Sequence, residues 1–120
     1  MITKAIRKCK VYVATGYTDL RRGIDGLASI VHDTFKTSPV QKDTAFLFCG
    51  RRNDRYKGLL WEEDGFVMFY KRFQIGSLNW PRKANELLRL TPEQYDSLME
   101  GIEIVARRPI KKISSAKFKY

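Results

Sequence analysis

The feature that most constrains this chain is a group of three apolar segments separated by two turn signals. The segments 44–49, 56–62 and 66–73 are rich in aromatic and β-branched residues, which favour strands. Asp64-Gly65 is a strong signal for a two-residue hairpin turn, and Asn53-Asp54 is a weaker signal of the same kind. The pattern therefore predicts an up-down-up antiparallel β-meander.

Two-residue turns would also fix the register of the meander, with Trp61 opposite Met68 and Phe46 opposite Trp61. One face would then carry Phe46, Phe48, Leu59, Trp61, Met68 and Tyr70. The other face would carry Ala45, Leu47, Leu60, Val67 and Phe69. Because both faces are apolar, neither can be wholly exposed to water. We expect a helix on one face, and a second helix, the first strand or a partner on the other.

The rest of the chain predicts two helices and two short strands. Residues 10–15 alternate in the manner of a strand, and residues 78–81 are typical of an edge strand ended by proline. Apolar residues at helical spacing predict a helix over about 22–35, with Thr18 or Asp19 as its cap.

The segment that follows the predicted edge strand, residues 82–90, is expected to form a helical turn. A capping box from Thr91 to Gln94, with Pro92 at the first helical position, predicts the second helix. Gly101 is expected to end it.

Composition favours one compact domain, because 43% of the residues are hydrophobic and 12% are aromatic. We predict a single α+β domain over 1–106, in which a small antiparallel β-meander is packed with two α-helices. A basic C-terminal tail follows at 107–120. No apolar run approaches the ~18 residues of a membrane span, and the start lacks the apolar segment of a signal peptide. We expect a cytoplasmic protein with no membrane contact.

Charge points to the class of partner. The chain has 23 Lys and Arg against 13 Asp and Glu, a net charge of +10, which favours a polyanion. In a meander, alternate turns lie at opposite ends of the sheet, so the charges sort by sign. The basic end would hold Arg51, Arg52, Arg55, Lys57, Lys71 and Arg72, and the acidic end Glu62, Glu63 and Asp64. The register places Lys57 opposite Arg72 and Arg52 opposite Arg55, and a bound anion would relieve that repulsion.

Few side chains offer catalytic chemistry. Two cysteines and one histidine do not make the four ligands of a structural zinc site, and Cys9 and Cys49 are expected to be small buried hydrophobes. The acidic candidates for magnesium, Asp54 and the 62–64 cluster, lie at opposite ends of the predicted sheet. We expect no enzymatic activity, no metal and no cofactor.

Aromatic residues suggest two further surfaces. Trp61, Tyr70 and Phe48 on one sheet face resemble a platform on which bases stack, although such residues more often build a core. Trp80 lies beside Pro81 in the predicted edge strand, where we expect it to be partly exposed and to bind a protein partner.

Three stretches carry a family resemblance. VYVATGYTDLRRGIDGLASIV, FLFCGRRNDRYKGLLWEEDGFVMFYKRF and LNWP resemble the TnpB-type accessory protein, encoded by the second open reading frame of bacterial insertion sequences of family sixty-six. The resemblance covers roughly residues 9–81, and TPEQYDSLMEGI extends it to 102. Ser77 departs from it, because the family tends to place a basic residue there, and the tail after Ile102 has no family counterpart. The resemblance implies a protein that accompanies a separate transposase and brings no catalytic residues.

The leading hypothesis is a non-catalytic accessory protein of DNA transposition that binds nucleic acid through a basic surface. The predicted contacts are Arg21, Arg22, Arg51, Arg52, Arg55, Lys57, Lys71, Arg72, Lys111 and Lys112. The alternative is an adaptor that docks the transposase or a sister accessory protein through the apolar sheet or Trp80, without touching DNA. A metal-dependent nuclease is the third possibility.

Overall fold

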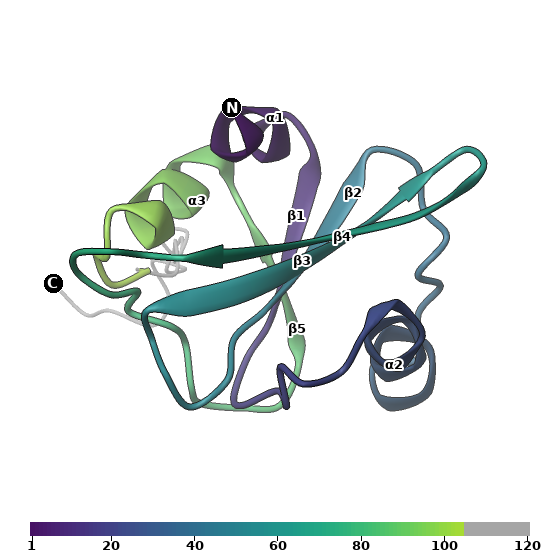
Figure 1. Ribbon diagram of the computed structural model, residues 1–120, viewed down its shortest axis with the longest axis horizontal. Coiled ribbons are helices and arrows are strands. Elements are labelled where there is room, and N and C mark those ends of the chain that lie inside the picture. The colour runs from purple at the N-terminus through teal and green to yellow at the C-terminus, as the bar shows by residue number, and fades with distance from the viewer. Residues whose placement is uncertain (105–120) are drawn as a thin grey trace, which may run out of the picture.

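The structure is a computed structural model that describes residues 1–104. A five-stranded mixed sheet forms the centre of the molecule (Figure 1). The elements are α1 (Ile2–Arg7), β1 (Lys10–Ala14), α2 (Ile24–Ser29), the π-helical turn η1 (Ile30–Thr34), β2 (Thr44–Phe48), β3 (Arg55–Glu62), β4 (Gly65–Arg72), β5 (Leu87–Leu90) and α3 (Pro92–Met99). The strand order is β4-β3-β2-β1-β5. The α+β class is confirmed, but the sheet is not purely antiparallel, because β1 runs parallel to β2.

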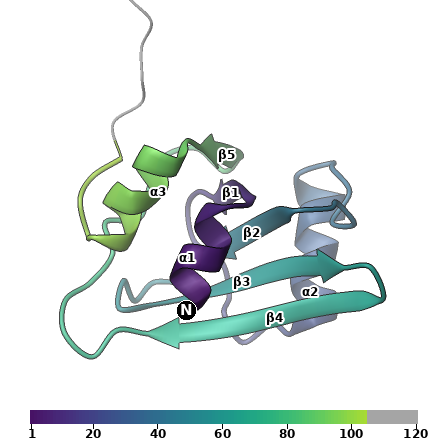
Figure 2. The ribbon, with the colours of Figure 1, turned by 90° about the horizontal axis from the view of Figure 1, so that it is seen from above.

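Helices cover both faces of the sheet. Figure 2 shows α2 on one side and α1 with α3 on the other. The α2 side buries Leu27 and Val31 of the helical layer against Phe46, Phe48 and Leu59. The opposite side buries Ile6, Tyr95 and Leu98 of α1 and α3 against Val11, Val13, Ala45 and Leu47. The chain's own helices therefore cover most of the two apolar faces that the sequence predicts.

The meander has the predicted strands but a different register. Trp61 pairs with Phe66 and Leu59 with Met68, two residues away from the predicted pairing. The β3–β4 turn consists of residues 63–64, neither of which has positive φ, so it is not the type I′ turn that Asp64-Gly65 predicts. The β2–β3 loop spans residues 49–54 instead of two. A shift of two residues keeps every side chain on its predicted face, because strand faces alternate with a period of two.

Several predicted elements differ from the structure. Residues 82–90 contain β5 instead of a helical turn, because Leu87–Leu90 pairs with β1. Residues 78–81 form no strand, and α1 is a helix that the local pattern did not predict. Neither Thr18 nor Asp19 caps α2, whose N-cap is Gly23. The capping box of α3 is confirmed, with Thr91 and Gln94 bonding each other's backbone.

Two buried tyrosines on the α1–α3 side give a matched test of packing. The hydroxyl of Tyr56 has no hydrogen-bond partner within residues 1–104, whereas that of Tyr95 donates to the carbonyl of Thr3 at 2.9 Å. Burial raises the pKa of Tyr56 to about 12, so the phenol is neutral at physiological pH.

Tyr56→Phe is therefore expected to raise the free energy of unfolding by about 1 kcal/mol, because it removes an unpaired buried hydroxyl. Tyr95→Phe should lower the same quantity by about 1 kcal/mol, because it removes a made hydrogen bond. Urea denaturation followed by circular dichroism measures both. Equal losses of stability in the two variants would show that the Tyr56 hydroxyl has a partner after all.

Candidate nucleic-acid interface

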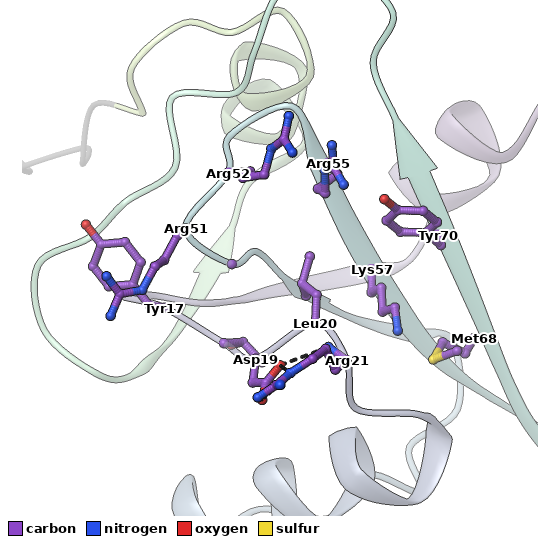
Figure 3. A pocket seen from close by; sticks show the side chains of 12 residues that line it. Tyr17, Asp19, Leu20, Arg21, Arg51, Arg52, Arg55, Lys57, Met68 and Tyr70 are labelled. Carbon is purple, nitrogen blue, oxygen red and sulfur yellow. Dashed lines mark hydrogen bonds and ion pairs between the residues drawn. The ribbon is translucent and has the colours of Figure 1, made fainter.

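Five of the predicted basic residues gather around one hollow, which we call the basic pocket (Figure 3). Its volume is about 790 Å³. It is lined by Tyr17, Thr18, Asp19, Leu20, Arg21, Gly50, Arg51, Arg52, Arg55, Lys57, Met68 and Tyr70. These residues come from the segment after β1, from the β2–β3 loop, and from β3 and β4. Folding thus brings three separate parts of the chain, residues 17–21, 50–57 and 68–70, to one site.

The alternation of β3 and β4 explains why the strand residues of the pocket lie on one face. Lys57 and Tyr70 are direct cross-strand partners, and Arg55 and Met68 each lie two residues away on the same strands. Leu59, the next residue of β3 on this face, packs beneath the α2–η1 layer. Tyr70 is 50% exposed, so the helical layer leaves this end of the face open.

Two carboxylates partly compensate the cations. Asp19 pairs with Arg21 at 2.8 Å. Asp54, which does not line the pocket, accepts a hydrogen bond from Arg55 at 2.9 Å and lies 3.7 Å from Arg52. The bond from Arg55 holds the pKa of Asp54 below its usual value, and the bond from Arg21 does the same for the pKa of Asp19. Both carboxylates are therefore ionised at neutral pH.

Positive charge nevertheless prevails, because five cationic side chains and one carboxylate line the pocket. The Arg51 guanidinium has no hydrogen bond or ion pair within the part of the chain that the structure describes, and it is exposed. Lys57 donates from Nζ to the carbonyl of Arg22 at 2.9 Å, which keeps its charge at the pocket. Such a cluster suits an anion that offers several oxygen acceptors.

The remaining predicted contacts are divided among other places. Arg72 is exposed and lies opposite Arg55, so the predicted pairings of Lys57 with Arg72 and of Arg52 with Arg55 are wrong. Like charges still face one another across the strands, but the pair is Arg55 and Arg72. Arg22 is exposed next to the pocket without lining it.

Lys71 lies on the opposite face of the sheet. Its Nζ donates to the hydroxyl of Thr3 at 3.2 Å and lies 4.9 Å from the centre of the Phe73 ring. The six cations of the predicted basic end therefore do not form one continuous surface. Lys111 and Lys112 lie outside the described residues, as does the predicted tail at 107–120.

Trp80 does not occupy an exposed edge. Its side chain is 3% exposed, and its indole N–H donates to the carbonyl of Ala14 at 3.0 Å. The predicted partial exposure of Trp80 is wrong, because Leu78 and Trp80 pack into the core instead of residues 78–81 forming an edge strand.

The predicted stacking platform is present only in part. Phe48 is fully buried, and Trp61 packs edge-on against Phe66 with 5.0 Å between the ring centres. Tyr70 alone of the three lines the basic pocket. Its neighbour across the hollow is Tyr17, a residue that the sequence pattern did not single out (Figure 3).

Arg82 is a further residue that sequence reasoning missed. Its guanidinium lies 4.2 Å from the centre of the Tyr17 ring. It also donates to the carbonyl of Gly16 at 2.8 Å and to the side chain of Asn53. Arg82 thus links the segment after β1 to the β2–β3 loop. Local patterns give no signal for contacts between segments so far apart in sequence.

The acidic end is separate, as the meander predicts. Glu62, Glu63 and Asp64 line a second hollow of about 790 Å³ with Val40, Lys42, Asp43 and Trp61. Figure 1 shows the β3–β4 turn at the other end of the sheet from the β2–β3 loop. Within residues 1–104, no three His, Cys, Asp or Glu side chains are grouped in a way that could hold a metal ion.

The helices of the described residues are also short. None of those in 1–104 has both the length and the apolar character needed to cross a membrane.

Comparison with known proteins identifies the family. The sequence model of the family described as IS66 Orf2-like protein matches residues 9–109 and so extends past Ile102, where the motif resemblance ends. The chain is 30% identical to the uncharacterized protein y4jC of Sinorhizobium fredii over 108 residues, 88% of this chain and 92% of the relative. It is 32% identical to the uncharacterized protein y4hO of the same organism over 94 residues, 78% of this chain and 81% of the relative. No solved structure matches. The chain therefore belongs to the IS66 Orf2-like family, the accessory proteins of that insertion sequence.

Proposed function

We propose that this accessory protein of transposition binds DNA without catalysis, through phosphate contacts at the basic pocket. The observation that carries the proposal is the gathering of five cationic side chains, Arg21 and four from residues 51–57, around one hollow lined by a single carboxylate. Folding such a cluster costs electrostatic repulsion, which a bound polyanion would offset. The net charge of +10 would add a long-range attraction to DNA.

The cations best placed to bind phosphate are those that make few hydrogen bonds or ion pairs within the protein. Arg51 is exposed and unpaired within the described residues, and Arg52 has only the distant contact to Asp54 at 3.7 Å. Arg21 and Arg55 are held by carboxylates but keep free N–H donors, because a guanidinium has five. Contacts of this kind position a protein on DNA and carry little sequence information.

A salt series tests the proposal. Fluorescence anisotropy with a labelled duplex should show a logarithm of the association constant that falls linearly with the logarithm of salt concentration. Four to five phosphate contacts predict a slope of roughly −4, which corresponds to a loss of affinity of about 250-fold between 50 and 200 mM salt. Duplexes of unrelated sequence should behave alike. Absence of binding at low salt would contradict the proposal.

The alternative function is an adaptor that binds the transposase or a sister accessory protein. Helices cover both sheet faces except at the end that carries the basic pocket, and Trp80 is buried. Exposed apolar side chains within residues 1–104 include Ile75, which is 94% exposed in the loop after β4, and also Val40 and Ile102. A pull-down of the transposase by the intact protein, unaffected by removal of DNA binding, would favour the adaptor.

Catalysis is tested separately. We expect supercoiled plasmid to stay intact after incubation with the protein and magnesium or manganese. Nicked or linear product that disappears with EDTA would instead support a metal-dependent nuclease.

A further inference from the structure

The shape of the basic pocket indicates a narrower class of ligand than its charge does. Phosphates on the outside of a duplex can be neutralised by cations on a flat or convex surface. Here the cations surround a hollow, and its volume of about 790 Å³ falls within the roughly 300–1,000 Å³ of pockets that enclose small molecules. Apolar side chains of Leu20, Met68 and Tyr70 form part of its lining. Contacts to phosphate alone would leave that apolar lining unused.

Two tyrosine rings line the same hollow and remain accessible. Tyr70 is 50% exposed and is held on β4 by its pairing with Lys57. Tyr17 is 64% exposed and lies on the segment after β1. Figure 3 shows the two rings on different sides of the pocket, with Arg51, Arg52 and Arg55 along one edge between them. Exposed aromatic rings beside cations are the arrangement with which proteins bind single-stranded nucleic acid.

Tyr17 is also fixed in position. Arg82 stacks on its ring at 4.2 Å while donating to the carbonyl of Gly16 and to the side chain of Asn53. A loop aromatic that is held before binding loses little conformational entropy when a ligand stacks on it. The Tyr17 ring remains mostly exposed to water, so these contacts hold it in position without burying it in the core.

We infer that the pocket receives an unpaired nucleotide of single-stranded DNA. Its base would stack on Tyr70, with Tyr17 as a second ring, and its flanking phosphates would contact Arg51 and Arg52. This inference rests on the proposed function and narrows it from any DNA backbone to a strand whose bases are free. It assigns the apolar lining and both tyrosines a role in binding that phosphate contacts do not give them.

The test compares two ligands with the same phosphates. A labelled single-stranded oligothymidylate of about twelve nucleotides is titrated beside an abasic strand of the same length, at one salt concentration. The wild-type protein should bind the thymidylate about tenfold more tightly than the abasic strand, because stacking of one base has that order of effect. Tyr70→Leu should remove most of this difference, and Tyr70→Phe should keep it. Leucine preserves apolar volume without a ring face, and phenylalanine preserves the ring without the hydroxyl.

Val67→Ala is the matched control, because Val67 is an exposed β4 residue on the other face of the sheet. It should bind both strands as the wild type does. Equal affinity of the wild type for both strands, or unchanged thymidylate binding by Tyr70→Leu, would overturn the inference. In that case steep salt dependence with both ligands would leave the proposed function standing. If neither strand nor a duplex binds at low salt, the proposed function fails together with the inference.

Discussion

Replacing Arg51 and Arg52 by glutamate is expected to weaken DNA binding by about two orders of magnitude at low salt. The double variant removes two phosphate contacts and adds two negative charges to the basic pocket. It should also make the salt dependence shallower, by about one unit of slope for each phosphate that is no longer neutralised. Both side chains are exposed in the β2–β3 loop, so the fold should be unaffected. Fluorescence anisotropy with wild type and variant measures both effects.

The control for this experiment reverses two cations elsewhere. Lys4 and Lys36 are exposed, and neither lines the basic pocket. Lys4→Glu with Lys36→Glu changes the net charge by the same amount, so it should reduce affinity far less if position matters. Equal reductions in affinity in the two double variants would mean that DNA responds to total charge and not to the pocket. Retained transposase pull-down by the Arg51 and Arg52 variant would separate DNA binding from an adaptor role.

Replacing Trp80 by alanine is expected to lower the free energy of unfolding by about 3–5 kcal/mol, a large part of the roughly 5–15 kcal/mol of a typical domain. Trp80 is 3% exposed, and its removal leaves a cavity in the core on the α1–α3 side of the sheet. The carbonyl of Ala14 is also left without its indole donor. Guanidinium denaturation followed by circular dichroism measures the change without depending on tryptophan fluorescence.

A milder variant separates packing from hydrogen bonding. Trp80→Phe keeps most of the ring but not the N–H, so it should cost about 1–3 kcal/mol. A Trp80→Ala protein that is as stable as the wild type but no longer retains a protein partner would restore the partner-binding role that the sequence suggested. Reduced stability without such a selective defect assigns Trp80 to the core.

Elements with strong local signals could be predicted from the sequence. The apolar runs of β2, β3 and β4 and the capping box at Thr91 each depend on neighbouring residues, so their positions differ from prediction by a residue or two. The faces of the meander were also predictable, because a register error of two residues does not change them. The register itself was not, since the β2–β3 loop is longer than its Asn53-Asp54 signal indicates.

Elements that depend on distant partners could not be predicted. β5 forms because Leu88 and Leu90 pair with β1, at the opposite end of the described chain, and the local pattern LLRL fits a helix equally well. Trp80 is buried in the core, where its indole N–H donates to the carbonyl of Ala14, a residue far away in the sequence. In each case tertiary contacts decide between local alternatives that the sequence leaves open.

The residues of the basic pocket likewise divide into those that local patterns predict and those that only tertiary contacts bring together. The cations of the pocket could be found from their clustering beside a turn, because alternation and turn position suffice to bring Arg51, Arg52 and Arg55 together. Tyr17 and Arg82 could not, since they meet only when the segment after β1 and the segment before β5 lie against the β2–β3 loop. The placement of Lys71 was wrong because proximity to one end of the sheet does not specify the face.

Chemical-shift mapping by NMR tests most directly whether the basic pocket is the DNA site. Titration of labelled protein with a short oligonucleotide should shift the amide signals of residues 17–21, 50–57 and 68–70. The signals of residues 62–64, at the acidic end, should stay in place. Shifts concentrated at α3 or at the acidic turn, or uniform small shifts over the whole surface, would contradict the account.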